Sequence, residues 1–131
     1  MDPRTARCAC GQLRIDVSGA PVRVSVCHCL DCQRRTGSAF GVQARFPAAA
    51  TQVHGTHGEY IRTGDSGGRM RASFCPQCGS TVFYVVDAMP DLVAIPVGAF
   101  ADPAFPAPDV SYYEERMHAW LTLGDDMRHE H

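Results

Sequence analysis

Cys27-His28-Cys29-Leu30-Asp31-Cys32 places three thiols within six residues. Three thiols this close together are unusual as inert core residues, and thiolates prefer soft or borderline cations such as Zn²⁺. Three neighbouring sulfurs can fill three corners of a tetrahedral site and leave the fourth for another ligand. The stretch therefore predicts a metal site built on Cys27, Cys29 and Cys32, called here the three-cysteine group.

The four remaining cysteines lie in two pairs far apart in the sequence. Cys8 and Cys10 stand near the start, and the second pair belongs to Cys-Pro-Gln-Cys-Gly at 75–79. This second pair has the form of a zinc knuckle, in which glycine permits a tight turn and backbone N–H groups face the sulfurs. We therefore expect a closed, structural zinc site, the four-cysteine group, made by Cys8, Cys10, Cys75 and Cys78. A redox-active Cys-x-x-Cys pair is the alternative, but the surrounding βαβ pattern is missing.

The sequence leaves open what completes the three-cysteine group. A zinc site with three protein ligands can take water or substrate at its open position, whereas a histidine would close it. No histidine stands at a regular knuckle spacing from the triplet, which favours an exchangeable position. The histidines that could close the site instead are His28, His54, His57 and His118. His28 itself is expected to point away from the metal, either exposed or supporting the ligands from behind.

Length and charge narrow the class of protein. The 131 residues predict one domain, residues 1–131, small enough to gain stability from bound metal. The formal net charge is −2, and the chain has no acidic or basic block. Nucleic-acid binders usually carry a basic patch, so we do not expect a nucleic-acid partner.

The start of the chain and its thiols indicate the compartment. The first seven residues lack the apolar run of a signal peptide, and no stretch is apolar for long enough to span a bilayer. Seven cysteines would leave one unpaired in an oxidising compartment, and a Cys-x-Cys loop strains a disulfide. We therefore expect a soluble cytoplasmic protein with reduced, metal-bound thiols and no membrane partner.

Alternation of apolar and polar residues predicts a mainly β fold. Residues 12–17 and 22–26 alternate on either side of a Ser-Gly-Ala-Pro turn, which predicts a β-hairpin. Pro96 suggests an edge or an irregularity in its strand. Residues 33–38 are expected to form a loop or short helical turn, and 102–109 to run extended over the surface. The other predicted strands are 40–46, 59–63, 69–74, 80–86 and 92–97.

Polar residues just after the third thiol are candidates for substrate binding. Arg34 and Arg35 could hold carboxylates of an anionic substrate, and Ser38 adds a hydroxyl donor. The alternative for all three is an ordinary solvated loop. Trp120 is expected to pack in the core or at its rim rather than to act as a stacking platform.

Together these motifs resemble the glutathione-dependent formaldehyde-activating enzymes, a family whose domain is shared with a centromere protein. The resemblance covers nearly the whole chain. It implies a β-tent fold of small antiparallel sheets stapled by zinc, with a structural zinc at the four-cysteine group and a catalytic zinc at the three-cysteine group, and therefore two zinc ions per chain. The segments that carry it are Cys8-x-Cys10-Gly11, Cys27-His28-Cys29-x-x-Cys32 with Thr36-Gly37-Ser38-Ala39-Phe40, Phe74-Cys75-Pro76-x-Cys78-Gly79-Ser80, and the late Trp120.

The named reaction of that family condenses glutathione with formaldehyde to S-hydroxymethylglutathione. The resemblance therefore implies a zinc-dependent carbon–sulfur lyase, or thiol–aldehyde adduct enzyme, with Cys27, Cys29 and Cys32 at its catalytic site. Its partners would be a small-molecule thiol and an aldehyde. The alternative is a non-enzymatic zinc module that binds proteins or acts as a chaperone. A methionine sulfoxide reductase of similar fold would need a redox cysteine outside the metal sites, and all seven cysteines are already assigned.

Overall fold

The computed structural model describes residues 3–64 and 67–131, which form two β-sheets with a few short helices. A small antiparallel sheet has the order β1-β2-β5, with β1 at Arg4–Arg7, β2 at Arg14–Val17 and β5 at Thr51–His54. A large sheet has eight strands, and its pairs are antiparallel except that β10 runs parallel to both β3 and β11. Across the large sheet the strands are β11 (Arg128–His129), β10 (Val110–Tyr112), β3 (Arg23–Cys27), β4 (Gly41–Pro47), β9 (Leu92–Pro96), β8 (Thr81–Val86), β7 (Arg69–Phe74) and β6 (Gly58–Thr63).

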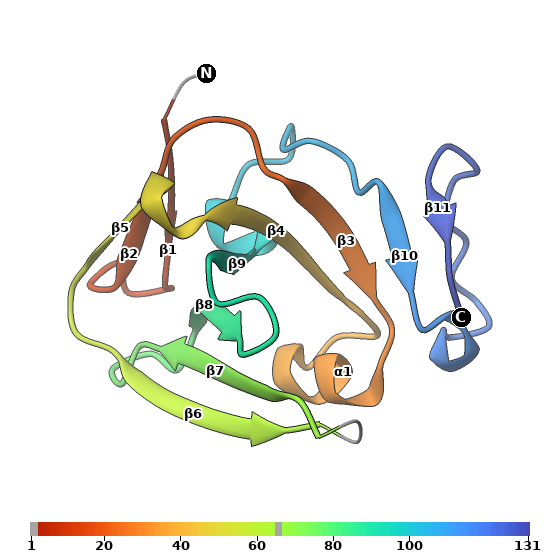
Figure 1. Ribbon diagram of the computed structural model, residues 1–131, viewed down its shortest axis with the longest axis horizontal. Helices are drawn as coiled ribbons and strands as arrows, with labels where there is room; N and C mark the ends of the chain where they lie inside the picture. Colours follow the sequence, from red (N-terminus) through yellow and green to blue (C-terminus); the bar gives the residue numbers. More distant parts are fainter. Residues whose placement is uncertain (1–2, 65–66) are drawn as a thin grey trace.

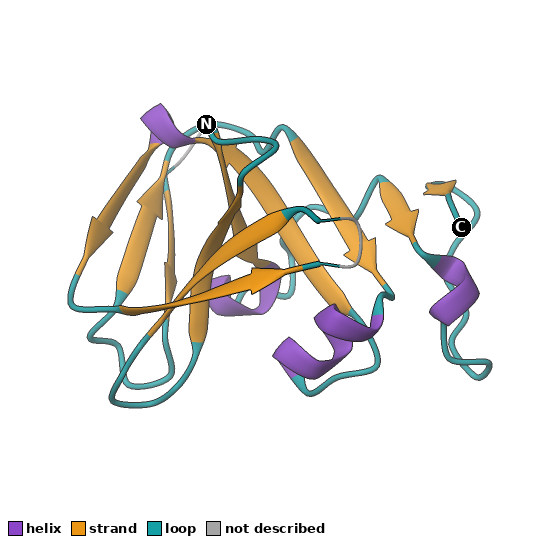
Figure 2. Ribbon diagram, turned by 60° about the horizontal axis from the view of Figure 1, so that its bottom comes forward, coloured by secondary structure: helices purple, strands orange, loops and turns teal. Residues whose placement is uncertain are grey.

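Four short helical segments lie at the ends of strands (Figures 1 and 2). The α-helix α1 (Leu30–Thr36) follows β3 and lies between the ends of β3 and β4 on one side and the ends of β6 and β7 on the other. The 3₁₀ turns are η1 (Ala48–Ala50), η2 (Val97–Phe100) and η3 (Glu114–Arg116). None of the helices in the described ranges is long and apolar enough to cross a membrane.

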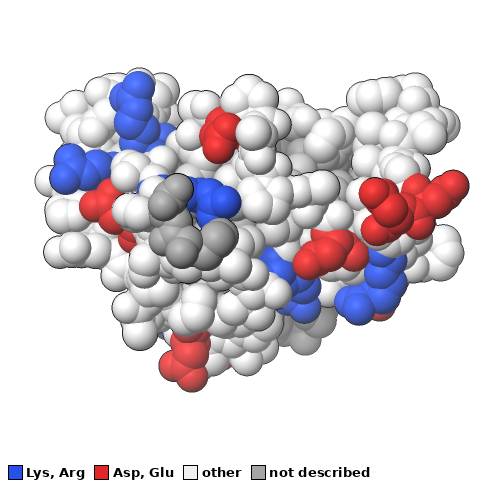
Figure 3. All heavy atoms as spheres, turned by 90° about the horizontal axis from the view of Figure 1, so that it is seen from above, with Lys and Arg blue, Asp and Glu red and all other residues white. Residues whose placement is uncertain are grey.

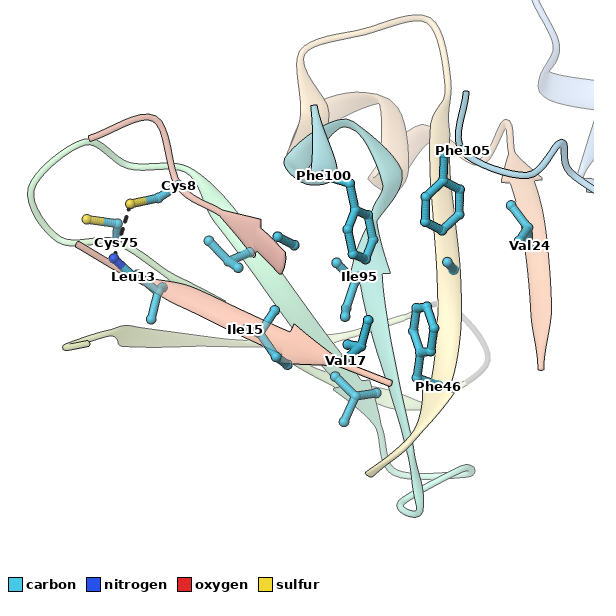
Figure 4. Packing of buried hydrophobic residues seen from close by; sticks show 14 residues of the cluster. Cys8, Leu13, Ile15, Val17, Val24, Phe46, Cys75, Ile95, Phe100 and Phe105 are labelled. Atoms are coloured by element: carbon cyan, nitrogen blue, oxygen red, sulfur yellow. Dashed lines mark hydrogen bonds between the residues drawn. The ribbon is translucent and has the colours of Figure 1, made fainter. Parts of the chain in front are cut away.

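The core lies between the small sheet and one face of the large sheet (Figure 4). Alternate residues of each strand point to the same side, so a strand with apolar residues at every second position presents one apolar face. The turn η2 closes one end of this core, where the rings of Phe100 and Phe105 stack with centroids 4.7 Å apart. The core residues include Ala6, Ile15 and Val17 from the small sheet, Leu13 just before β2, and Val24, Ala44, Phe46 and Ile95 from the large sheet.

The opposite face of the large sheet carries the candidate site and combines polar residues with a second, smaller apolar cluster of Met70, Ala72, Tyr84 and Ala94. The register pairs Arg23 with Arg45, Ser25 with Gln43 and Cys27 with Gly41, so these side chains share a face. Tyr84 of β8 reaches the same face, because it pairs with Ala94 and Ala94 pairs with Arg45. We call this side of the large sheet the open face.

The predicted hairpin between 12–17 and 22–26 is wrong. Both segments are strands, but β2 pairs with β1 and β5, whereas β3 pairs with β4 and β10 in the other sheet. Alternation of apolar and polar residues indicates that a strand has one buried face, but it does not identify the neighbouring strand. The turn at 18–22 therefore carries the chain from one sheet to the other.

The five other predicted strands are confirmed as β4, β6, β7, β8 and β9, with ends that differ by a residue in some of them. The edge suggested by Pro96 is wrong, since β9 lies between β4 and β8. Pro96 is tolerated because it is the last residue of that strand, where the ladder ends. The stretch 102–109 is not extended throughout, because the Phe105 N–H closes a turn by donating to the Asp102 carbonyl oxygen at 3.0 Å and the Phe105 ring is buried. Strands β1, β5, β10 and β11 had no predicted counterpart.

On the face shown in Figure 3, acidic and basic side chains are interspersed and form no single large patch of one sign.

Candidate metal centres and active-site cavity

The four-cysteine group joins the start of the chain to the knuckle at 75–79. Its four Sγ atoms all lie within 4.8 Å of one another. Cys10 Sγ is 3.6 Å from both Cys8 Sγ and Cys75 Sγ. Tetrahedral zinc with Zn–S bonds of about 2.3 Å places its sulfurs about 3.8 Å apart. The group could therefore hold a metal ion, and such an ion would tie the β1–β2 turn to the β7–β8 turn.

Hydrogen-bond donors surround the sulfurs of this group. The Leu13 N–H donates to Cys8 Sγ at 3.3 Å, and the Gln12 side-chain amide donates to Cys75 Sγ at 3.1 Å. Burial opposes ionisation of Cys75, yet the donor from Gln12 and two backbone N–H groups lower the pKa of its thiol. Hydrogen bonds from the Ser80 hydroxyl and backbone N–H lower the pKa of Cys78 to about 5. Thiolates are the metal-binding form, so these donors favour the ligand state.

The three-cysteine group is assembled where β3 passes into α1. Cys27 ends β3, and Cys32 lies in the first turn of α1. Cys29 is the N-cap of the helix, and its Sγ accepts the Cys32 N–H at 3.3 Å. The three Sγ atoms lie within 4.8 Å of one another, so the group could hold a metal ion. The three cysteines can come together within six residues because α1 begins at Leu30, between Cys29 and Cys32.

The three thiols differ in pKa because they form hydrogen bonds with one another. Hydrogen bonds from Cys27 and Cys32, joined by the backbone N–H of Cys32, lower the pKa of Cys29 to about 2. Cys27 shows the reverse effect, because its hydrogen bond to Cys29 raises the pKa of its thiol. Without metal, negative charge therefore concentrates on Cys29. A bound cation would stabilise the thiolate form of all three cysteines.

No histidine of the described chain joins this group. His54 Nε2 instead lies 3.1 Å from a carboxylate oxygen of Asp16, and His57 packs its ring on Phe83. His118 Nε2 lies 2.9 Å from the side-chain oxygen of Gln33. The histidine alternative left open by the sequence thus has no support from the arrangement of the described residues.

His28 does not join the three-cysteine group and is not exposed, so the part of the prediction that allowed an exposed ring is wrong. The residue is fully buried, and burial lowers the pKa of its imidazole. Its Nε2 lies 2.9 Å from the Ser111 hydroxyl, and its backbone N–H donates to the Tyr112 carbonyl oxygen at 3.1 Å. His28 therefore holds the cysteine loop against β10.

The three-cysteine group lines a cavity of about 470 Å³ on the open face. Arg45, Arg62 and Arg69 line it from β4, β6 and β7, whereas Asp31 is the one carboxylate among its described lining residues. Arg62 forms an ion pair with Asp31, and Arg69 lies 3.8 Å from a carboxylate oxygen of Asp87. In the described chain Arg45 has no carboxylate partner. The cavity can therefore accept a negatively charged group.

Tyr84 brings a phenol to the wall of this cavity. Its side chain is buried, and the guanidinium groups of Arg35 and Arg45 lie 5.0 Å and 6.0 Å from its ring centroid. Burial raises the pKa of Tyr84 to about 12. The phenol therefore stays protonated at neutral pH and can donate a hydrogen bond into the cavity.

Gln43 supplies an acceptor beside the same sulfurs. Its side-chain amide nitrogen donates to the Ser25 hydroxyl at 2.8 Å, which fixes the orientation of the amide. The amide oxygen is buried without a hydrogen-bond partner among the residues described. An unpaired buried acceptor costs free energy unless something binds to it. Because Gln43 lines the cavity, a substrate N–H or O–H group could satisfy this oxygen.

The predicted substrate residues lie outside the cysteine cavity. Arg34 is exposed and pairs with Asp31 across 3.7 Å. Arg34 and Arg35 line a neighbouring hollow of about 400 Å³ between α1 and strands β6 and β7. Ser38 lies exposed beyond the end of α1, with its N–H donating to the Thr36 hydroxyl at 3.1 Å. Of the three, Arg35 comes nearest to the site, through its contact with Tyr84.

Sequence reasoning missed Gln43, Arg45, Arg62 and Tyr84. Each belongs to a predicted strand, and in an alternating strand a polar residue is normally assigned to the face that is exposed to solvent. The available signal was that Gln43 and Arg45 follow the cysteines and share one strand face. The sequence does not show that this face closes over a cavity.

Trp120 does not pack in the core. It is 70% exposed and meets the ring of His118 edge to face at 5.7 Å. The expected core packing is therefore wrong.

The fold and the site define a mainly β protein with two cysteine groups, each of which could hold a metal ion. Comparison with protein families shows a match over residues 3–116 to the family described as glutathione-dependent formaldehyde-activating enzyme, and the chain belongs to this family. The match includes all seven cysteines and ends before Trp120.

Among solved structures, the crystal structure of a Rhodobacter sphaeroides protein, a structural genomics target, is similar, with a TM-score of 0.58. It shares 19% sequence identity, and the similarity covers 76% of this chain and 91% of that chain. At this identity the likeness shows a shared fold. No curated protein sequence matches the chain.

Proposed function

We propose that the chain is a single-domain, zinc-dependent carbon–sulfur lyase of β-tent fold that combines a small anionic thiol, such as glutathione, with an aldehyde, such as formaldehyde. The observation that carries the proposal is a group of three cysteines that could hold a metal ion, with no fourth protein ligand among the described residues, on the wall of a 470 Å³ cavity. Zinc sites with an open position bind water or substrate, whereas closed sites are structural. Reduced thiols are needed for ligation, which favours a reducing compartment such as the cytoplasm.

The donor chemistry of both cysteine groups fits zinc. All seven donors are sulfurs, which zinc accepts in tetrahedral sites, and N–H groups face several of them. We assign a structural role to the four-cysteine group and a catalytic role to the three-cysteine group. Zinc at the latter would hold the substrate sulfur as a thiolate and lower the pKa of the incoming thiol.

The residues around the cavity suggest how the two substrates are held. Arg45, which has no carboxylate partner in the described chain, would bind a carboxylate of the thiol substrate, and Arg62 would assist where it lines the cavity. The Gln43 amide oxygen would accept an amide N–H of the same molecule. These contacts would orient the thiol sulfur toward the cysteines, because both ends of the molecule are anchored.

Tyr84 would act on the aldehyde. As the carbon–sulfur bond forms, the carbonyl π bond breaks and its electron pair moves to oxygen, so negative charge develops there. The protonated Tyr84 phenol can donate a hydrogen bond to that oxygen. The adduct oxygen ends protonated and the thiol has lost one proton, so the step balances without a redox partner. The reverse step cleaves the carbon–sulfur bond, as expected of a lyase.

The predicted contacts at Arg34, Arg35 and Ser38 stay proposals. Arg35 is the best placed, because its guanidinium lies against the Tyr84 ring and would hold the phenol in position. Arg34 and Ser38 would contact only a substrate that extends past α1 into the neighbouring hollow.

The test is a thiol titration of cobalt-substituted protein, read from the thiolate-to-cobalt charge-transfer bands. Glutathione should change the bands and bind more tightly than the neutral 2-mercaptoethanol, because only glutathione carries carboxylates for the cavity arginines. Adding ¹³C-formaldehyde should then increase the rate of adduct exchange, measured by NMR above the uncatalysed background. A spectrum that no thiol alters, with exchange at the background rate, would leave the non-enzymatic zinc module as the function.

A further inference from the structure

We propose that the open face carries a second binding site, an anion site formed by Arg23, Arg45 and Arg128. These residues line a hollow of about 380 Å³ beside the cysteine cavity, and Arg45 borders both spaces. The ligand is a small molecule that presents a carboxylate or phosphate group on an apolar body. This proposal stands apart from any reaction at the cysteines.

The first observation is a pair of like charges that face each other. Arg23 of β3 and Arg45 of β4 are direct partners in the antiparallel register, so both side chains leave the same face. Like charges at such positions repel and destabilise the sheet. In the described part of the chain neither arginine has a carboxylate in ion-pair range. An anion bound between them would remove this repulsion.

The second observation is an unsatisfied donor. The Nε of Arg23 is buried and has no hydrogen-bond partner among the described residues. The guanidinium lies 5.6 Å from the ring centroid of Tyr112, and its Nη2 lies 3.9 Å from the Met89 sulfur. These contacts fix the position of the N–H donors of the Arg23 guanidinium. A planar, fixed guanidinium is suited to two-point binding of carboxylate or phosphate oxygens.

The carboxylates near the hollow do not neutralise it. Asp109 is the one acidic residue among the described lining residues, and one of its oxygens accepts the Val24 N–H at 3.2 Å. Arg128 pairs with Glu130 at 2.8 Å, but this exposed pair is open to solvent and adds little free energy. With Glu130 counted as well, three guanidinium groups against two carboxylates still leave the hollow with a net positive charge.

The rest of the lining is apolar. Val22, Leu92 and Val110 supply aliphatic surface, and Met89 adds its thioether. A bare inorganic ion would leave this surface in contact with water, whereas a small organic acid or phosphate ester would cover it. The hollow therefore fits an anion with a short hydrocarbon part.

The site is too far from the sulfurs to take part in chemistry. Arg23 precedes Cys27 by four residues on β3, which corresponds to about 13 Å along an extended strand. A ligand here would nevertheless alter the cysteine cavity, because it competes for the guanidinium of Arg45. Occupation of the anion site would thus compete with any cavity ligand that uses Arg45.

The test is isothermal titration of the zinc-loaded protein at low ionic strength with succinate, glycerol phosphate and inorganic phosphate. At least one organic anion should bind more tightly than inorganic phosphate and raise the melting temperature beyond the effect of sodium chloride at equal ionic strength. Binding of succinate alone assigns a carboxylate ligand and binding of glycerol phosphate alone a phosphate ligand. If no organic anion binds more tightly than inorganic phosphate, the site is not the one proposed.

Substitutions of single arginines test whether the anion binds at this hollow. Arg23→Gln should weaken it about tenfold, because a hydrogen-bonded charge pair is lost. Arg14→Gln, the same change on an exposed arginine of the small sheet, should leave it unchanged. Arg128→Gln, at an exposed position, should weaken it severalfold and decides the question if Arg23→Gln does not fold. The proposal is overturned if the Arg14 and Arg23 variants bind the anion with equal affinity. If Arg23→Gln does not fold, wild-type affinity in the Arg128 variant overturns it instead. No thiol or aldehyde enters these measurements, so their outcome is independent of the lyase assay.

Discussion

Tyr84 shows how one residue takes its properties from its surroundings. Its side chain is buried with the guanidinium groups of two arginines close to its ring, and the residue lines the cysteine cavity. Burial would cost free energy for a phenolate, so the group remains a neutral donor. A hydrogen-bond donor directed at developing charge is worth more in such a site than in water.

Tyr84→Phe should therefore lower the rate of adduct formation about 100-fold, because it removes the donor and leaves the ring in place. Thiol binding to the cobalt-substituted protein should not change, since the proposed partner of the phenol is the aldehyde oxygen and not the thiol sulfur. Tyr60→Phe, at an exposed position on β6, is the control. A Tyr84→Phe enzyme with the wild-type rate would remove the phenol from the mechanism.

Gly55 is a residue whose role is purely conformational. Its φ is +102°, and a Cβ added there would lie 2.0 Å from the Gln12 carbonyl oxygen. The contact is tight because the Gln12 side chain bonds both the Thr56 N–H and the Thr56 carbonyl oxygen, which clamps the turn after β5 against the β1–β2 turn.

Gly55→Ala should lower the free energy of unfolding by at least about 2 kcal/mol, since backbone must move and the residue is strained. Gly98→Ala is the matched control, because a Cβ there meets nothing within 4 Å and φ is not positive. Urea denaturation of both variants measures the difference. Similar losses in the two proteins would contradict the structural account.

At the scale of elements, the parallel pairing of β10 with β3 places the C-terminal segment against the cysteine loop. His28 contributes the buried contact to Ser111, and Gln33 of α1 donates to the carbonyl oxygens of His28 and Arg116 at 2.8 and 3.2 Å. These bonds explain why the loop is held from behind while its sulfurs face the cavity.

Ser111→Ala should cost about 1–3 kcal/mol, because it leaves the buried His28 ring nitrogen without its partner. Hydrogen exchange should accelerate first in β10 and β11, and only weakly in the small sheet. Ser18→Ala, on an exposed turn, should change neither quantity. Uniform acceleration over both sheets would show that β10 is not a separate unit.

At the scale of the whole molecule, metal would connect parts that the strands alone leave weakly joined. The four-cysteine group ties β1 and β2 to the β7–β8 turn, whereas the three-cysteine group spans six consecutive residues. Closing a long loop constrains the unfolded chain much more than closing a short one.

Purified protein should thus contain two zinc ions per chain by elemental analysis, and Cys78→Ser should lower the melting temperature much more than Cys29→Ser. The second variant should mainly lose one zinc ion and the thiol response. Chelator should remove the metal of the three-cysteine group first. Equal destabilisation by the two substitutions would make both sites structural.

Much of the site could be predicted from the sequence because cysteine spacing is a local constraint. Thiols separated by one or two residues are well placed to bind one metal, so the triplet and the two cysteine pairs can be recognised without a structure. The mainly β character follows in the same way from alternation. The triplet and the alternation depend on neighbours along the chain, whereas joining the two distant cysteine pairs rests on the four ligands that a closed zinc site needs.

What only the tertiary structure decided depends on contacts between distant residues. The partner of β2, the burial of His28 and the exposure of Trp120 each depend on which surfaces meet, and composition does not encode that choice. The same holds for the cavity, whose wall takes Gln43, Arg62 and Tyr84 from three different strands. Each of these residues looks like an ordinary polar position in its own strand, because a strand fixes only which residues share a face and the packing of sheets decides what that face encloses.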